Sequence, residues 1–175
     1  FTMKLPIIGF GFLYAFVASL ILMRWKDPVV LALLIASVAV TGFRSLMLDR
    51  YQMAGGANQS HDDLRGWERR YAHFAFLFAF LVTALNLRVL ITHQPLIHTG
   101  TISLVFIFGA GVVSRTSCRP AICVGSLLIA VVPTALGMLV HGAIANEQPL
   151  HGAFFILFAL LLLAVRAMSL GSVGH

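Results

Sequence analysis

Long apolar runs alternate with short polar connections along most of the chain. Six of these runs approach the length of about 20 residues that an α-helix needs to cross a bilayer core. The pattern predicts an all-α membrane protein, with residues 1–175 forming one domain of six transmembrane helices arranged as three helical hairpins. The predicted spans are Leu5–Met23, Pro28–Leu46, Tyr71–Ile91, Ile97–Val113, Ala121–Val140 and Gly152–Ala167.

Three of the predicted spans begin in the same way, with a polar residue followed by proline. The pairs are Asp27-Pro28, Gln94-Pro95 and Gln148-Pro149. Proline at the first helical position sacrifices no hydrogen bond, so each pair is interpreted as a helix start. Inside the spans, Pro133 predicts a kink, and Asn86 predicts a hydrogen bond to a neighbouring helix.

Basic residues fall mostly on one side of these spans. If the N-terminus is cytoplasmic, nine of them lie inside and three outside, which predicts that both termini are cytoplasmic. The longest connection, residues 49–70, then lies in the cytoplasm. Its stretch "HDDLRGWERR" mixes both charges around Leu64 and Trp67, and predicts an interfacial helix that leads into the third span.

The composition agrees with a membrane protein. Hydrophobic residues make up 59% of the chain and charged residues 10%, with a mean hydropathy of +0.95. A soluble domain carries about 25% charged residues. In this setting the net charge of +6 is interpreted as cytoplasmic basic bias and contact with anionic lipid. The lipid bilayer is therefore the expected partner, and nucleic acid is not.

Four histidines lie near the outer ends of the predicted spans: His93, His98, His141 and His151. Histidine binds metals and changes charge near neutral pH, so a ligand, metal or proton site is one interpretation. His98 and His151 form the favoured metal-binding pair because each follows a "QPL" helix start. Haem held by two of these histidines is an alternative. The simpler alternative is that imidazole is merely tolerated at helix ends.

Catalytic motifs are missing from the sequence. It holds no nucleophile–base pair, phosphate-binding loop or paired carboxylates, and most of its six acidic residues lie in the 49–70 connection. The two cysteines, Cys118 and Cys123, are too few for a disulfide framework. No catalytic residue is assigned.

Two stretches resemble a known family. They are "GWERRYAHFAFLFAFLVTALNL", Gly66–Leu87, and "GAGVVSRTSCRPAICVGSLLIAVVPTALGMLV", Gly109–Val140. Both are similar to the N-terminal membrane region of bacterial GGDEF and GGDEF–EAL proteins, which make or degrade cyclic di-GMP. Cys118 departs from the Asn or Ser of that family. The motif residues are Trp67, Glu68, Arg69, Arg70, Arg115, Arg119 and Pro120.

The resemblance implies a sensory or anchoring input domain in the bacterial inner membrane. It also implies a homodimer and a covalently linked cytoplasmic catalytic domain after residue 175, either a diguanylate cyclase or a cyclic di-GMP phosphodiesterase. The motif residues would contact lipid headgroups or the linker to that domain. One alternative is a histidine-based metal- or haem-binding redox protein. A small transporter is less favoured, because the spans lack acidic residues.

Overall fold

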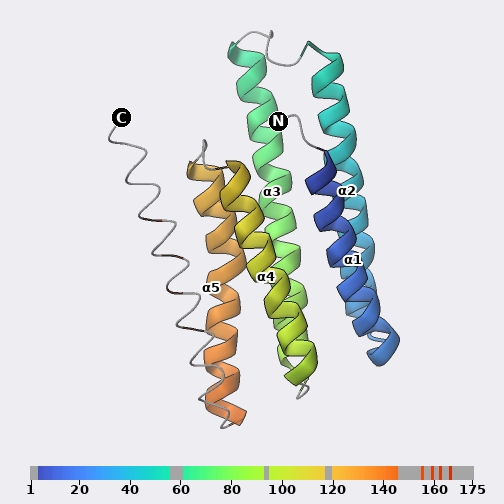
Figure 1. The fold of residues 1–175 in the computed structure, drawn as a ribbon, viewed down its shortest axis with the longest axis vertical. Coiled ribbons are helices and arrows are strands. Elements are labelled where there is room, and N and C mark those ends of the chain that lie inside the picture. Colours follow the sequence, from blue (N-terminus) through green and yellow to red (C-terminus); the bar gives the residue numbers. More distant parts are fainter. Residues whose placement is uncertain are drawn as a thin grey trace. The chain divides into compact units, whose positions relative to one another are not determined.

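Five α-helices make up most of the described chain (Figure 1). The computed structural model describes residues 4–55, 61–92, 95–116 and 120–145, and four single helical positions at 155, 159, 162 and 166. Among these residues no strand occurs, which confirms the predicted all-α fold class. The helices are α1 (Leu5–Trp25), α2 (Pro28–Met53), α3 (His61–Leu90), α4 (Pro95–Thr116) and α5 (Pro120–Ala145).

Four helices are long and apolar enough to cross a membrane. By length and composition they are Leu5–Trp25, Pro28–Met53, Asp62–Leu90 and Ala121–His141. Large apolar side chains stand exposed on α1, including Leu5 (85%), Phe12 (73%) and Met23 (80%). Such extensive apolar exposure is unusual in a soluble protein and is compatible with a bilayer as the surroundings.

Two of the six predicted spans are not among these four candidates. The described apolar stretch of α4, Ile97–Val112, is shorter than the other four. The predicted sixth span, Gly152–Ala167, lies outside the described residues apart from four single positions. The count of six spans and the cytoplasmic location of both termini stay predictions.

The connection between the second and third predicted spans is shorter than the expected 49–70. α2 continues to Met53 and α3 already begins at His61. The residues that extend α2 are mostly good helix formers, and Gly55, with φ of 102°, follows its end. α3 runs unbroken past Tyr71, so the expected interfacial helix and the third span form one helix of 30 residues.

The chain divides into two compact units, Phe1–Leu81 and Val82–His175, and the boundary falls inside α3. The single domain expected for residues 1–175 stays a prediction.

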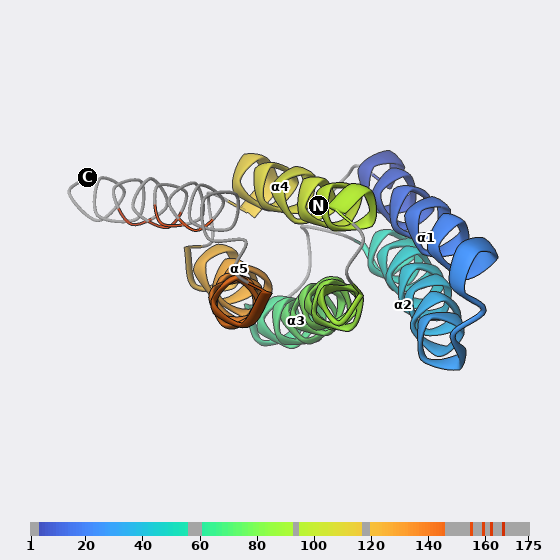
Figure 2. The ribbon, with the colours of Figure 1, turned by 90° about the horizontal axis from the view of Figure 1, so that it is seen from below.

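In the first unit, α1 and α2 form a hairpin with a two-residue turn (Figure 2). Lys26 takes a left-handed conformation with φ of 44°, and its N–H donates to the Leu22 carbonyl. The Asp27 carboxylate then accepts from the Val29 N–H at 2.9 Å and caps α2. Pro28 occupies the first helical position, which confirms the predicted helix start. α4 begins in the same way at Pro95.

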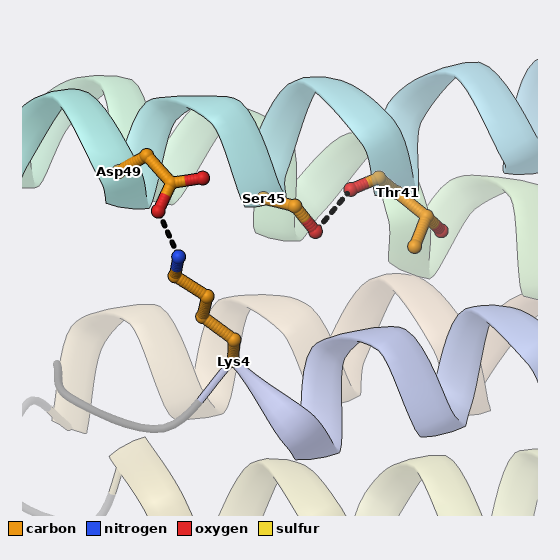
Figure 3. A network of polar contacts seen from close by, with 4 residues as sticks. All are labelled: Lys4, Thr41, Ser45 and Asp49. Carbon is orange, nitrogen blue, oxygen red and sulfur yellow. Dashed lines mark hydrogen bonds and ion pairs between the residues drawn. The ribbon is translucent and has the colours of Figure 1, made fainter.

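The open end of this hairpin is joined by an ion pair between the Lys4 ammonium and the Asp49 carboxylate (Figure 3). Farther along, the two helices approach closely at Gly11, where a Cβ atom would lie 2.9 Å from the Thr41 Cβ. Thr41 and Ser45 direct their hydroxyls to carbonyls of their own helix, Ser37 at 2.8 Å and Thr41 at 3.0 Å. The close approach of α1 and α2 at this point therefore depends on the small residue Gly11.

Aromatic side chains join this hairpin to the first part of α3. The Phe78 ring packs edge to face against Phe10 and Tyr14, with centroid distances of 5.6 and 5.7 Å. The fully buried Tyr14 hydroxyl donates to the Leu81 carbonyl at 3.0 Å. The Arg44 guanidinium lies 5.5 Å from the Tyr71 ring centroid and 5.8 Å from that of Phe78, so aromatic faces accommodate a cation within an apolar helix.

In the second unit, a threonine compensates for a proline. Pro133 lies inside α5 and has no N–H to donate to the Ile129 carbonyl one turn earlier. The buried Thr83 hydroxyl of α3 donates to that carbonyl at 2.7 Å, and the Ala130 carbonyl lies 3.3 Å away. A hydroxyl from a neighbouring helix is one way in which transmembrane helices satisfy a carbonyl freed by proline. This bond joins the last turns of α3 to α5.

Candidate functional site

Two of the four predicted histidines meet in the structure. His98 lies in the first turn of α4 and His141 in the last turns of α5. Their rings meet edge to face, with a centroid distance of 5.4 Å and an interplanar angle of 89°. His93 and His151 lie outside the described residues, so the favoured pair of His98 with His151 stays a prediction.

His98 is held in place by the turn that follows α3. Its side chain is buried, and its Nε2 atom is hydrogen-bonded to the Thr92 carbonyl. Since a carbonyl can only accept, Nε2 carries the proton, and in the neutral ring Nδ1 is then the nitrogen with a lone pair. Thr92 is fixed in turn by its hydroxyl, which donates to the Val89 carbonyl at 2.6 Å. The ring therefore has a defined tautomer and orientation.

A second buried polar contact lies one turn farther along α4. Asn86 of α3 donates through Nδ2 to the Thr101 carbonyl at 2.8 Å, which confirms the predicted bond to a neighbouring helix. The Thr101 hydroxyl donates a hydrogen bond to the His98 carbonyl at 3.1 Å. Within the described part of the chain, the Asn86 Oδ1 atom has no hydrogen-bond partner although the residue is only 1% exposed. Asn86 and Thr101, with the buried Thr92 and His98 and the half-buried His141, form a polar cluster of α3, the turn that follows it, α4 and α5.

An apolar groove borders the cluster. It has a volume of about 470 Å³ and lies between the end of α3 and the second half of α5. Gly137 lies at the contact of the two helices, where an added Cβ would be 2.5 Å from Leu87 Cδ2 and 3.0 Å from Leu90 Cδ1. His141 is the one polar residue among those that line the groove: Leu87, Leu90, Ile91, Pro133, Leu136, Gly137, Val140 and His141.

The His98–His141 pair does not fit haem. A bis-histidine haem needs the iron and the porphyrin plane between the two rings. An edge-to-face contact at 5.4 Å leaves no room for them. For a metal ion the pair supplies two imidazoles, and the described residues contain no group of three histidine, cysteine, aspartate or glutamate side chains placed to bind one.

The motif residues expected on the cytoplasmic side are distributed over three helices. Trp67, Glu68, Arg69 and Arg70 lie in the early turns of α3. The Arg70 guanidinium lies 5.4 Å from the Trp67 ring centroid, and that ring packs against Tyr51 of α2 at 5.8 Å. Arg115 belongs to the last turn of α4, Pro120 begins α5, and Arg119 lies outside the described residues. Contact of these residues with lipid or linker stays a prediction.

Sequence reasoning missed two residues that shape the site. Thr92 precedes the "HQPLIH" stretch and is an ordinary turn residue until the fold brings its carbonyl to His98. Thr83 lies in an apolar run, and its link to α5 follows from Pro133 only when both helices are placed. Pro133 itself was the available signal, because a proline inside a span requires a donor from elsewhere.

Comparison with protein-family models, curated proteins and solved structures finds no match to this chain.

Proposed function

We propose that the chain is the membrane-anchoring and sensory input domain of a bacterial cyclic di-GMP turnover protein. Its long apolar helices support the anchoring role. The likeness of Gly66–Leu87 and Gly109–Val140 to the membrane region of GGDEF and EAL proteins supports the link to cyclic di-GMP. In this proposal the chain spans the inner membrane six times with cytoplasmic termini, forms a homodimer, and is followed after residue 175 by a cyclase or phosphodiesterase domain.

The observation that carries the sensory role is the His98–His141 contact. It joins the first turn of α4 to the last turns of α5, and the His98 side chain is only 5% exposed. An ionisable group inside a membrane helix bundle is expensive to bury and usually has a functional role. A change in the charge or ligation of either ring would act directly on the packing of the two helices.

The size of such an effect follows from the ring separation. Two protonated imidazoles 5.4 Å apart repel by about 3 kcal/mol at an effective dielectric constant of about 20. That energy corresponds to a change of about 150-fold in an equilibrium between two packings of α4 and α5. A proton or a ligand that favours one packing therefore shifts the population toward it. The predicted sixth span, which follows α5 in sequence, would carry the change toward the cytoplasmic domain.

The test is the level of cyclic di-GMP in bacteria that carry the gene encoding this chain. We expect the double variant His98→Ala/His141→Ala to change that level relative to wild type at equal amounts of protein in the membrane. The matched control is His73→Ala, because His73 is exposed and its ring Nδ1 is hydrogen-bonded to the Arg69 carbonyl of its own helix. Equal levels of cyclic di-GMP in the wild type and both variant strains would refute the proposal. A strain that lacks the gene but has the same cyclic di-GMP level as the wild type would also refute it.

A histidine metal site is a second candidate, favoured by the way His98 is held. Metal-ligating histidines usually donate their other ring N–H to a carbonyl or carboxylate, as His98 does to Thr92. His93 or His151 would have to supply a further ligand. Elemental analysis of the purified chain tests this candidate. One metal ion per chain, lost in both His98→Ala and His151→Ala, supports it, and a metal-free wild type excludes it.

A further inference from the structure

The helices of the first unit share one boundary between exposed apolar surface and charged surface. On α1 the exposed apolar side chains run over residues 5–23, about 28 Å of helix, which is close to the thickness of about 30 Å of a bilayer core. Lys4 precedes this stretch and pairs with Asp49 of α2, so the two residues lie at one level (Figure 3). On α2 the exposed Leu46 is followed one turn later by the exposed Arg50. The charged residues beyond the boundary therefore lie at the level of lipid headgroups.

α3 crosses the same boundary in the opposite direction. Trp67 packs edge to face against Tyr51 of α2 at a centroid distance of 5.8 Å, which places the two rings at one level. The side chains of Arg69 and Arg70, which follow in the next turn, are exposed. Farther along the helix, the exposed surface becomes apolar at Leu77. Arginines of α2 and α3 therefore lie at the same headgroup level, next to exposed apolar surface.

The Arg70 side chain is positioned by an aromatic ring. Its guanidinium lies 5.4 Å from the Trp67 ring centroid, and that ring is held against Tyr51. A guanidinium that packs on an aromatic ring can present its N–H groups to a phosphate as a planar fork. Tryptophan itself is enriched at membrane interfaces, where its ring lies among the headgroups. Arg70 is thus suited to bind a phosphate at this depth.

The charges at this level favour an anion. The basic residues are Lys4, Arg50, Arg69 and Arg70, and the acidic residues are Asp49 and the half-buried Glu68. Asp49 is paired with Lys4, whereas none of the three arginines forms an ion pair with a described carboxylate. The other charged residues at the start of α3 are Asp62, Asp63 and Arg65. They precede Trp67 by two to five residues and lie about 3–8 Å farther out along the helix.

We propose that Arg50, Arg69 and Arg70 form a binding site for the headgroup of an anionic phospholipid, with Arg70 held toward the phosphate by Trp67. The exposed leucines next to the site fit the acyl chains of the same lipid. An acidic peptide or a soluble nucleotide would leave these leucines uncovered, whereas a lipid matches both surfaces. The inference goes beyond the proposed function, because lipid binding to the chain is measured without any cyclic di-GMP output.

The experiment is native mass spectrometry of the full chain in detergent micelles, titrated with dioleoyl phosphatidylglycerol or dioleoyl phosphatidylcholine. We expect the first phosphatidylglycerol to bind at least about tenfold more tightly than the first phosphatidylcholine. Arg69→Gln/Arg70→Gln should weaken phosphatidylglycerol binding at least about tenfold, because each basic residue near an anionic surface contributes about fivefold. Arg24→Gln/Lys26→Gln is the matched control. It removes the same charge from the other end of α1, beyond a Debye length, so the affinity should stay within about twofold.

Two further variants test how Arg70 is positioned. Arg70→Lys keeps the charge but loses the planar fork, and Trp67→Leu keeps the charge but removes the ring beside Arg70. Each should weaken phosphatidylglycerol binding by about two- to fivefold. Glycerophosphoglycerol, which is the same headgroup without acyl chains, should not displace the bound lipid at equal concentration. Circular dichroism and thermal melting check that each variant keeps its helices.

The proposal is overturned if phosphatidylcholine binds as tightly as phosphatidylglycerol, or if the control variant loses as much affinity as Arg69→Gln/Arg70→Gln. It is also overturned if glycerophosphoglycerol displaces the lipid, or if Arg70→Lys and Trp67→Leu both keep full affinity. Each of these results would leave the cyclic di-GMP test unaffected. Conversely, selective lipid binding without a cyclic di-GMP response would refute the proposed function alone.

Discussion

Thr83→Val removes a hydroxyl with little change in side-chain volume, at the point where α3 meets the proline of α5. In the wild type, the Thr83 Oγ1 atom lies 2.7 Å from the Ile129 carbonyl that Pro133 cannot serve. The variant leaves this carbonyl without a donor among apolar side chains. We expect the free energy of unfolding to fall by about 1–2 kcal/mol. This loss lies between the free energy of an interhelical hydrogen bond in a membrane and the cost of leaving a buried acceptor without a donor.

The reasoning predicts that this loss depends on Pro133. Pro133→Ala restores an N–H four residues after Ile129, so the carbonyl regains a helical partner. In the Pro133→Ala background, Thr83→Val should therefore cost less than about 0.5 kcal/mol, which gives a coupling energy of about 1 kcal/mol in a double-mutant cycle. Thr101→Val is the control, because that hydroxyl bonds to carbonyls of its own helix, and its cost should not depend on Pro133.

The assay is reversible unfolding of the four proteins in mixed micelles, followed by far-ultraviolet circular dichroism. Equal losses from Thr83→Val in both backgrounds would show that the hydroxyl does not compensate for the proline. No loss in either background would show that the hydroxyl is absent from the α3–α5 contact.

Three further substitutions test the first unit by the same unfolding assay. Gly11→Ala should destabilise by about 1–3 kcal/mol because the new Cβ overlaps Thr41. Gly9→Ala, whose new Cβ meets nothing within 4 Å, should be neutral or slightly stabilising. Equal effects of the two substitutions would contradict the close approach at Gly11. Asp27→Ala should cost about 1 kcal/mol through loss of the α2 cap, and an unchanged midpoint would count against that cap. Lys4→Met should cost about 0.5 kcal/mol at low salt and less at high salt, because the ion pair is partly exposed, and a large salt-independent loss would contradict this view.

The sequence was sufficient to predict where most helices begin. Asp27-Pro28 and Pro95 mark helix starts because a proline there needs no hydrogen bond, and both starts appear in the structure. The sequence was a poorer guide to the other helix boundaries. Hydropathy reports the apolar part of a helix, whereas α2 continues through polar helix formers to Met53, and α3 starts at His61 within a charged stretch.

The sequence predicts how far along their helices the histidines of the candidate site lie, but it does not predict which two of them are in contact. The positions of His98 and His141 at span ends follow from counting residues along each helix. Which two rings face each other depends on the rotation of α4 and α5 about their axes, and that rotation is set by packing. The Thr92 carbonyl that orients His98 is a backbone atom, so no side-chain pattern in the sequence points to it.

Cross-linking in native membranes tests most directly whether His98 and His141 face each other. The variant carries His98→Cys and His141→Cys, with Cys118 and Cys123 replaced by alanine, and is treated with a short bis-maleimide. Lys4→Cys/Asp49→Cys is the positive control, because that pair joins α1 and α2. We predict that, in the monomer band, trypsin cleavage after Arg115 leaves the α4 and α5 fragments joined. Separate fragments, alongside an efficient cross-link in the control, would contradict the account.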